Sequence, residues 1–207
     1  MALHPSQDVL RFWFPDPAPQ DHAAMVAQQE WWFRGGADAE ILSRFVPLYV
    51  RAVRGELDSW SKDAYSRLAL IIVFDQFSRT IHRGTALAYA QDSKARALAS
   101  EGLAVGHYAV LADPWEKTFF LLAFGHSEDV TDLDRAVTLA EELAAQAPES
   151  KRRMLEFSAN QARSHREVLR RFGRQPHRNE LLGRTSTPEE LAYLATNELV
   201  HQRTVPR

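Results

Sequence analysis

The segment from Leu68 to Arg83 constrains the fold more than any other part of this chain. It begins with seven consecutive apolar residues, Leu68 to Phe74, a run typical of a helix that is buried on nearly all sides. Four polar residues follow with helical spacing: Asp75, Gln76, Arg79 and Arg83. At about 100° per residue, these side chains fall within roughly a quarter to a third of the helix circumference. We therefore expect either an internal network of ion pairs or the wall of a binding site.

The remainder of the chain also has a helical period, and no segment shows strand alternation bounded by hairpin turns. We expect a single all-α domain over residues 1–207, in which antiparallel helical hairpins stack in sequence as in a tetratricopeptide-like array. The expected helices are Ser6–Phe14, Asp21–Phe33, Asp38–Arg54 with a kink at Pro47, Lys62–Arg83, Ala86 or Asp92 to Val105, Glu128–Ala147 and Ser150–Phe172.

Capping residues mark several of these boundaries. Two segments combine an N-cap, a proline in the first turn and a capping-box glutamate: Asp113–Glu116 and Thr187–Glu190. Asp38 and Asp92 are expected to cap helices in the same way. Glycines that permit a left-handed turn are expected to end three helices, at positions 84, 106 and 173.

The composition restricts the classes of protein and of chemistry. Lys and Arg number 25 against 27 Asp and Glu, so no overall positive charge attracts nucleic acid. The chain has no cysteine, which excludes disulfides, thiolate nucleophiles and cysteine-ligated zinc. The N-terminus lacks the pattern of a signal peptide, and no apolar run is long enough to span a membrane. We expect a soluble, cytoplasmic protein without cofactor or metal.

The charge is distributed unevenly near the C-terminus. Residues 128–149 contain seven acidic residues and one arginine, whereas residues 151–184 contain ten basic and three acidic residues. The simplest interpretation is that two adjacent helices attract each other.

Two histidines are candidates for chemistry. His126 stands in the sequence His-Ser-Glu-Asp, where Glu128 and Asp129 suit either the N-terminal turn of a helix or a site for ligand binding or proton transfer. His165 lies on an apolar stripe with 3-4 spacing, so it is either a core histidine or a second acid or base. No known metal-ligand spacing, GxSxG turn or P-loop is present.

The segment from Gly173 to Arg184 is rich in hydrogen-bond donors. Its donor side chains are Arg174, His177, Arg178, Asn179 and Arg184. Guanidinium groups bind carboxylates and phosphates in a bidentate manner, so convergence with Arg79 and Arg83 would create an anion site. The alternative is that this loop holds the acidic helix 128–149 in place.

Taken together, three motifs resemble a known family. The segments DQFSR (from Asp75), HSED (from His126) and FGRQPHRNELLGR (from Phe172), in this order and with Phe12–Phe14 and Trp31–Phe33, resemble the bacterial family called domain of unknown function 924. The resemblance covers nearly the whole chain. It implies a tetratricopeptide-like helical fold, and it implies no particular activity.

These observations lead to one expected site and three expected functions. The central helix, the HSED turn, His165 and the Arg-rich loop are expected to form one polar cleft. The first function is binding of a small anionic ligand or of an acidic peptide end. The second is a hydrolase or transferase in which His126 or His165 is the acid or base, oriented by Asp75, Glu128 or Asp129. The third is a structural scaffold. The sequence does not determine the oligomeric state.

Overall fold

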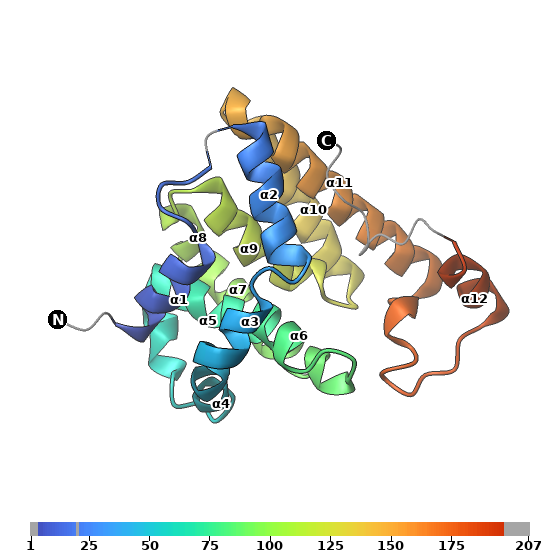
Figure 1. The fold of residues 1–207 in the computed structure, drawn as a ribbon. Helices are drawn as coiled ribbons and strands as arrows, with labels where there is room; N and C mark the ends of the chain where they lie inside the picture. Colours follow the sequence, from blue (N-terminus) through green and yellow to red (C-terminus); the bar gives the residue numbers. More distant parts are fainter. Residues whose placement is uncertain (1–3, 20, 197–207) are drawn as a thin grey trace.

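The architecture is helical throughout the part of the chain that the structure describes. The computed structural model describes residues 4–19 and 21–196, and every regular element in these residues is a helix, which confirms the all-α fold (Figure 1). The α-helices are α1 (Pro5–Trp13), α2 (His22–Phe33), α3 (Asp38–Glu40), α4 (Val46–Val53), α5 (Ala64–Ile72), α6 (Ser78–Ile81), α7 (Asp92–Ala104), α8 (His107–Val110), α9 (Pro114–Gly125), α10 (Val130–Ala145), α11 (Glu149–Phe172) and α12 (Pro188–Leu194). Short 3-10 or π segments are η1 (Ile41–Phe45), η2 (Asp58–Lys62), η3 (Val73–Phe77), η4 (Ala86–Tyr89) and η5 (Pro176–Arg178).

The apolar helix α5 lies in the middle of the core. It packs against α1, α7 and α9, and its side chains from Leu68 to Ile72 are almost completely buried. Aromatic side chains from α1, α2 and α9 pack together beside it, and Trp32 contacts both Trp115 and Phe119 edge-on or tilted. Most of the tryptophans are therefore core residues.

The central helix differs from the expected continuous helix over Lys62–Arg83. Residues 58–62 form a 3-10 turn, α5 begins after the N-cap Asp63, and the helix widens into the π segment η3 over Val73–Phe77. A π turn shifts the angular position of every residue that follows it, so the rotation of 100° per residue does not hold across this segment. Asp75 and Gln76 lie within this segment, and both are buried.

The predicted kink at Pro47 is also replaced by a π segment. Residues 41–45 form η1, and α4 begins at Val46 with Pro47 in its first turn. Proline cannot donate to the carbonyl four residues earlier and its ring crowds that carbonyl, which accounts for the widened turn before it.

Several predicted helix ends are confirmed, and two predicted caps are wrong. Both capping boxes are present, at the start of α9 and of α12. Asp38 and Asp92 make no capping hydrogen bond, because their carboxylates bind arginine side chains instead.

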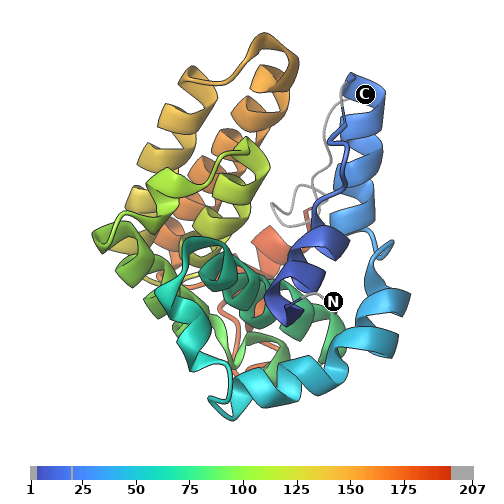
Figure 2. The same cartoon turned by 90° about the vertical axis from the view of Figure 1, so that its left-hand side faces the viewer.

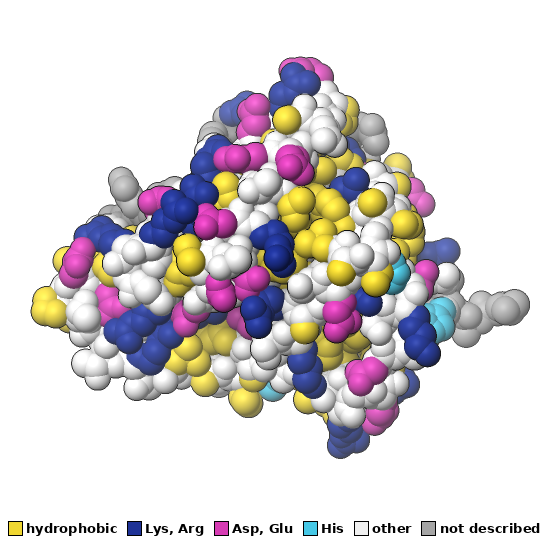
Figure 3. Space-filling view, turned by 180° about the vertical axis from the view of Figure 1, so that it is seen from behind, with side chains coloured by type: hydrophobic (Ala, Val, Ile, Leu, Met, Phe, Trp, Pro, Cys, Tyr) yellow, Lys and Arg dark blue, Asp and Glu magenta, His cyan; other side chains and the backbone are white. Residues whose placement is uncertain are grey.

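The helices α9, α10 and α11 follow one another and pack side by side, and α2 stands opposite them (Figure 2). Ion pairs join α10 to α11 as the charge pattern predicted, with Arg170 2.9 Å from Asp134 and Arg163 bonded to Glu141. On the face shown in Figure 3, basic and acidic side chains alternate, and hydrophobic side chains gather in the upper half of the view. Within residues 4–19 and 21–196, no helix is long and apolar enough to cross a membrane.

Candidate functional site

Asp75 is the buried centre of a polar network on the π segment η3. Its side chain is only 1% exposed. One carboxylate oxygen lies 2.7 Å from Nδ1 of His126, at the end of α9, and the other accepts a hydrogen bond of 2.5 Å from Gln76. Arg79 lies 3.2 Å from the same carboxylate. Three groups thus converge on one carboxylate, and the internal network of ion pairs, one of the two arrangements expected for this helix, is present.

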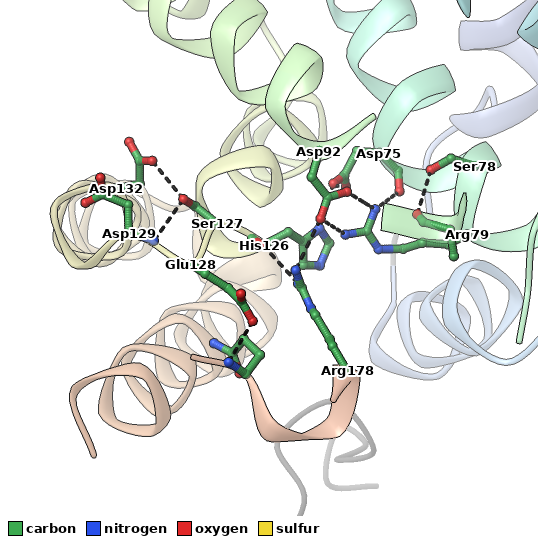
Figure 4. A network of polar contacts seen from close by, with 12 residues as sticks. Asp75, Ser78, Arg79, Asp92, His126, Ser127, Glu128, Asp129, Asp132 and Arg178 are labelled. Carbon is green, nitrogen blue, oxygen red and sulfur yellow. Dashed lines mark hydrogen bonds and ion pairs between the residues drawn. The ribbon is translucent and has the colours of Figure 1, made fainter. Parts of the chain in front are cut away.

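A second carboxylate, Asp92, lies between two arginines (Figure 4). Arg79 approaches it to 3.0 Å, and Arg178, from the Arg-rich loop, approaches it to 3.3 Å. Arg178 also donates to the backbone carbonyl of His126 at 2.9 Å. Both guanidinium groups lie over the ring of Tyr89, with Arg178 4.7 Å from the ring centroid. The network therefore links four separate parts of the sequence.

Burial and charge shift the pKa values of this network in opposite directions. Burial pushes the pKa of Asp75 upward, but the charges of Arg79 and His126, with hydrogen bonds from His126 and Gln76, outweigh this and hold the pKa far below its usual range. Burial raises the pKa of Asp92, and the neighbouring charge of Asp75 adds to that effect. Burial also lowers the pKa of Arg178. Because Arg79 contacts both carboxylates and the charge of Asp75 acts on Asp92, the ionisation of one carboxylate depends on that of the other.

The two acidic residues of the HSED turn make different contacts. Asp129 caps α10 by accepting a hydrogen bond from the backbone of Thr131 at 2.8 Å. Glu128 instead accepts two hydrogen bonds from Arg184, at 2.6 and 3.0 Å, and one from the backbone of Gln175 at 2.8 Å. These contacts fasten the Arg-rich loop to the turn, so Glu128 and Arg184 hold Arg178 close to His126.

Arg174 and Asn179 belong to a separate cluster on the far side of this loop. Both bind Glu190 of α12, with the Arg174 contacts at 2.6 and 2.7 Å. The Arg174 hydrogen bond, together with the backbone of Thr187 and the amide of Asn179, lowers the pKa of Glu190 to about 2. Similarly, Arg83 forms a bidentate pair with Asp38 at 2.6 and 2.9 Å. The five arginines expected to converge therefore fall into four groups, each paired with a carboxylate: Arg79 together with Arg178, and Arg83, Arg174 and Arg184 each by itself.

A cavity of about 500 Å³ lies between α2 and the helices α9, α10 and α11. Its walls are mostly apolar, and its polar part contains side chains from the network just described. Seven of the residues predicted for the site line the cavity: Gln76, Arg79, Arg83, His126, His165, His177 and Arg178. The other predicted residues lie outside its lining: Asp75, Glu128, Asp129, Arg174, Asn179 and Arg184.

His165 lines the cavity. From the sequence it could have been either a core histidine or a residue of the site. On its stripe, Met154 and Val168 are buried in the core, whereas Ser158, Gln161 and His165 line the cavity. The 3-4 spacing identifies the inner face of a helix and does not distinguish a packed neighbour from an open space.

The sequence interpretation missed three parts of the site. Asp92 was assigned to a helix cap, Tyr89 was not singled out, and the apolar wall residues such as Leu122 and Leu155 follow the same pattern as core residues. Of these, only Asp92 could have been found from the sequence. It closely follows a helix that carries Arg79 and Arg83, so its carboxylate is a candidate ion-pair partner for them. Among the residues that the structure describes, no three His, Asp or Glu side chains gather into a group suited to a metal ion.

Comparisons with known proteins agree with the resemblance seen in the sequence. The family model of a bacterial protein of unknown function, DUF924, matches residues 9–198. The solved structure of a protein of unknown function from Agrobacterium tumefaciens has 34% sequence identity and a TM-score of 0.75, and the match covers 92% of this chain and 96% of that chain. No curated protein matches significantly.

Proposed function

This chain belongs to the bacterial DUF924 family, whose description assigns no activity, and we propose that it binds a small anionic molecule in the cavity between α2 and α9–α11. Of the two ligand classes expected from the sequence, the small molecule suits this site better than an acidic peptide end. Ligand cavities for small molecules are typically about 300–1,000 Å³, mostly apolar, with a few polar groups that orient the ligand.

One observation carries the proposal: the cations line the cavity, and the carboxylates that pair with them lie behind. Arg79 and Arg178 both line the cavity, whereas Asp75 and Asp92 do not. A ligand beside this network therefore meets guanidinium and imidazole groups, while Glu30 and Arg34 of α2 also line the cavity. Because Asp92 holds both guanidinium groups in place before a ligand arrives, little side-chain freedom is lost on binding.

Native mass spectrometry of freshly purified protein tests this function. Ala140 lines the cavity, so Ala140→Phe should fill part of it, and Ala145→Phe, at an exposed position on the same helix, is the matched control. We expect a non-covalent additional mass on the wild-type protein and on Ala145→Phe, and its loss from Ala140→Phe. Absence of any additional mass from the wild type, or its retention by Ala140→Phe, would argue against the proposal.

The second candidate is an enzyme that uses His126, and the contact of 2.7 Å between its Nδ1 and buried Asp75 favours it. A carboxylate that fixes one imidazole nitrogen orients the ring for general acid or base catalysis, and His126 lines the cavity. A hydrolase of this kind should cleave a p-nitrophenyl ester and lose that activity in His126→Asn but not in Asp129→Asn. Equal rates in all three proteins would exclude His126 as the acid or base.

A further inference from the structure

The lining of the cavity changes from apolar to polar along two of its helices, α9 and α11. On α9, Trp115 lies in the apolar part of the lining, and His126 directly follows the C-terminal end of the helix. These two residues are 11 positions apart, which corresponds to about 16 Å along a helix. On α11, Leu155 and His165 mark the same change, about 15 Å apart. Both helices begin at the same end, since Lys151 near the start of α11 pairs with Asp113 at the start of α9, 2.6 Å apart. Along α9 and α11 the cavity therefore has one apolar end and one polar end.

The charge at the polar end suits a single negative charge. The two positive charges of Arg79 and Arg178 are offset by those of Asp75 and Asp92. This cluster therefore has little net positive charge, and the other ionisable groups at the polar part of the lining are the imidazoles of His126, His165 and His177. A head group with one negative charge brings the least uncompensated charge into this partly buried place, whereas a phosphate monoester would bring a second one.

From this shape and charge we infer that the ligand is an amphiphile that carries one carboxylate on an extended apolar tail, as an acyl-chain acid does. This inference rests on the proposed function and names its ligand class. The carboxylate lies at the end that contains Arg178 and His126, and the tail extends between α9 and α11 toward Trp115 and Leu155. Burial of the tail supplies most of the affinity, and the guanidinium groups set the orientation.

Isothermal titration calorimetry with four simple probes, each below its micelle concentration and at matched ionic strength, tests the inference. Decanoate carries the tail and the carboxylate, decan-1-ol the tail alone, acetate the carboxylate alone, and decyltrimethylammonium the tail with the opposite charge. We expect saturable binding of decanoate, and binding at least about tenfold weaker for each of the other three. In the series from hexanoate to decanoate, the affinity should rise by about two- to fourfold per methylene.

Two variants locate the binding. Ala140→Phe should abolish the binding of decanoate, while the exposed Ala145→Phe should bind as the wild type does. Equal affinities for decanoate and decan-1-ol, or for decanoate and acetate, would overturn the inference, as would unchanged binding by Ala140→Phe. If the protein is a dimer and decanoate dissociates this dimer, the apolar wall binds a second copy of the chain. This result too would overturn the inference.

The two proposals fail in different ways. If decanoate does not bind, but a co-purified molecule is present on the wild type and absent from Ala140→Phe, the cavity is a ligand site for another class of molecule. In that case only the amphiphile is wrong. If neither is observed, the proposed function itself fails.

Discussion

Asp92 lies between Arg79 and Arg178, and Asp75 holds Arg79 and His126 from the other side. Each carboxylate thus fixes two cationic or proton-binding groups that line the cavity. Buried ion pairs contribute little net stability, because desolvation offsets the attraction, but the loss of one partner is costly. These carboxylates therefore serve mainly to orient the cationic side chains, and the fold depends on keeping each pair intact.

We predict that Arg79→Ala destabilises the protein by about 3 kcal/mol, the lower end of the range for a broken buried pair, since Arg79 is 23% exposed. Asp75 would remain buried with only His126 and Gln76 as partners. Urea unfolding measures this loss. The control is Asp129→Ala, which removes an exposed helix cap and should cost clearly less. Equal small losses in both variants would mean that Asp75 does not need its arginine.

The lowered pKa of Glu190 predicts that the unfolding free energy of the protein depends on pH. Its pKa is lowered from 4.5 to about 2, chiefly by Arg174, so its contribution to folding is complete above the unfolded pKa and is lost as the pH falls through the folded pKa. The difference in unfolding free energy between the wild type and Glu190→Gln should therefore shrink between about pH 4.5 and about pH 2. Urea unfolding at several pH values checks this. A difference that stays constant across this window would show that the charge of Glu190 is not involved.

At the scale of the elements, sequence reasoning predicts features that depend on adjacent residues and fails for features that tertiary packing decides. Capping boxes and glycine stops depend on a few adjacent residues, so the starts of α9 and α12 and the end of α11 could be predicted. The π segment η3 has no proline and no local signal, and tertiary packing decides it. For the same reason the role of Asp92 was missed, since its arginine partners come from residues 13 and 86 positions away.

The ion pairs between α10 and α11 should matter much less than the buried network. Arg163 and Glu141 are each more than 40% exposed, and exposed pairs contribute about 0–1 kcal/mol. We predict that Arg163→Ala lowers the unfolding free energy by less than about 1 kcal/mol, measured by urea unfolding beside Arg79→Ala. A loss as large as that of Arg79→Ala would show that the contact between α10 and α11 depends on these charges.

At the scale of the whole molecule, the cavity is a property of the tertiary arrangement. Its walls come from α2, near the N-terminus, and from α9–α11, in the second half of the chain (Figure 2). Apolar residues on these helices have the same spacing whether they face a neighbour or an open space. The sequence therefore singled out some of the polar residues that line the cavity, among them Arg79, His126 and Arg178, and it contained no signal for the apolar wall.

The central claim is that this cavity binds a carboxylate amphiphile at the end formed by Arg178 and His126. Nuclear magnetic resonance of the arginine Nε–Hε groups and of the histidine rings, during titration with decanoate, tests it directly. We predict saturable shifts for Arg178 and His126 and no comparable shift for Arg174, which binds Glu190 outside the cavity lining. Equal shifts for Arg174 and Arg178, or no shift for Arg178 and His126 at saturating decanoate, would contradict the claim.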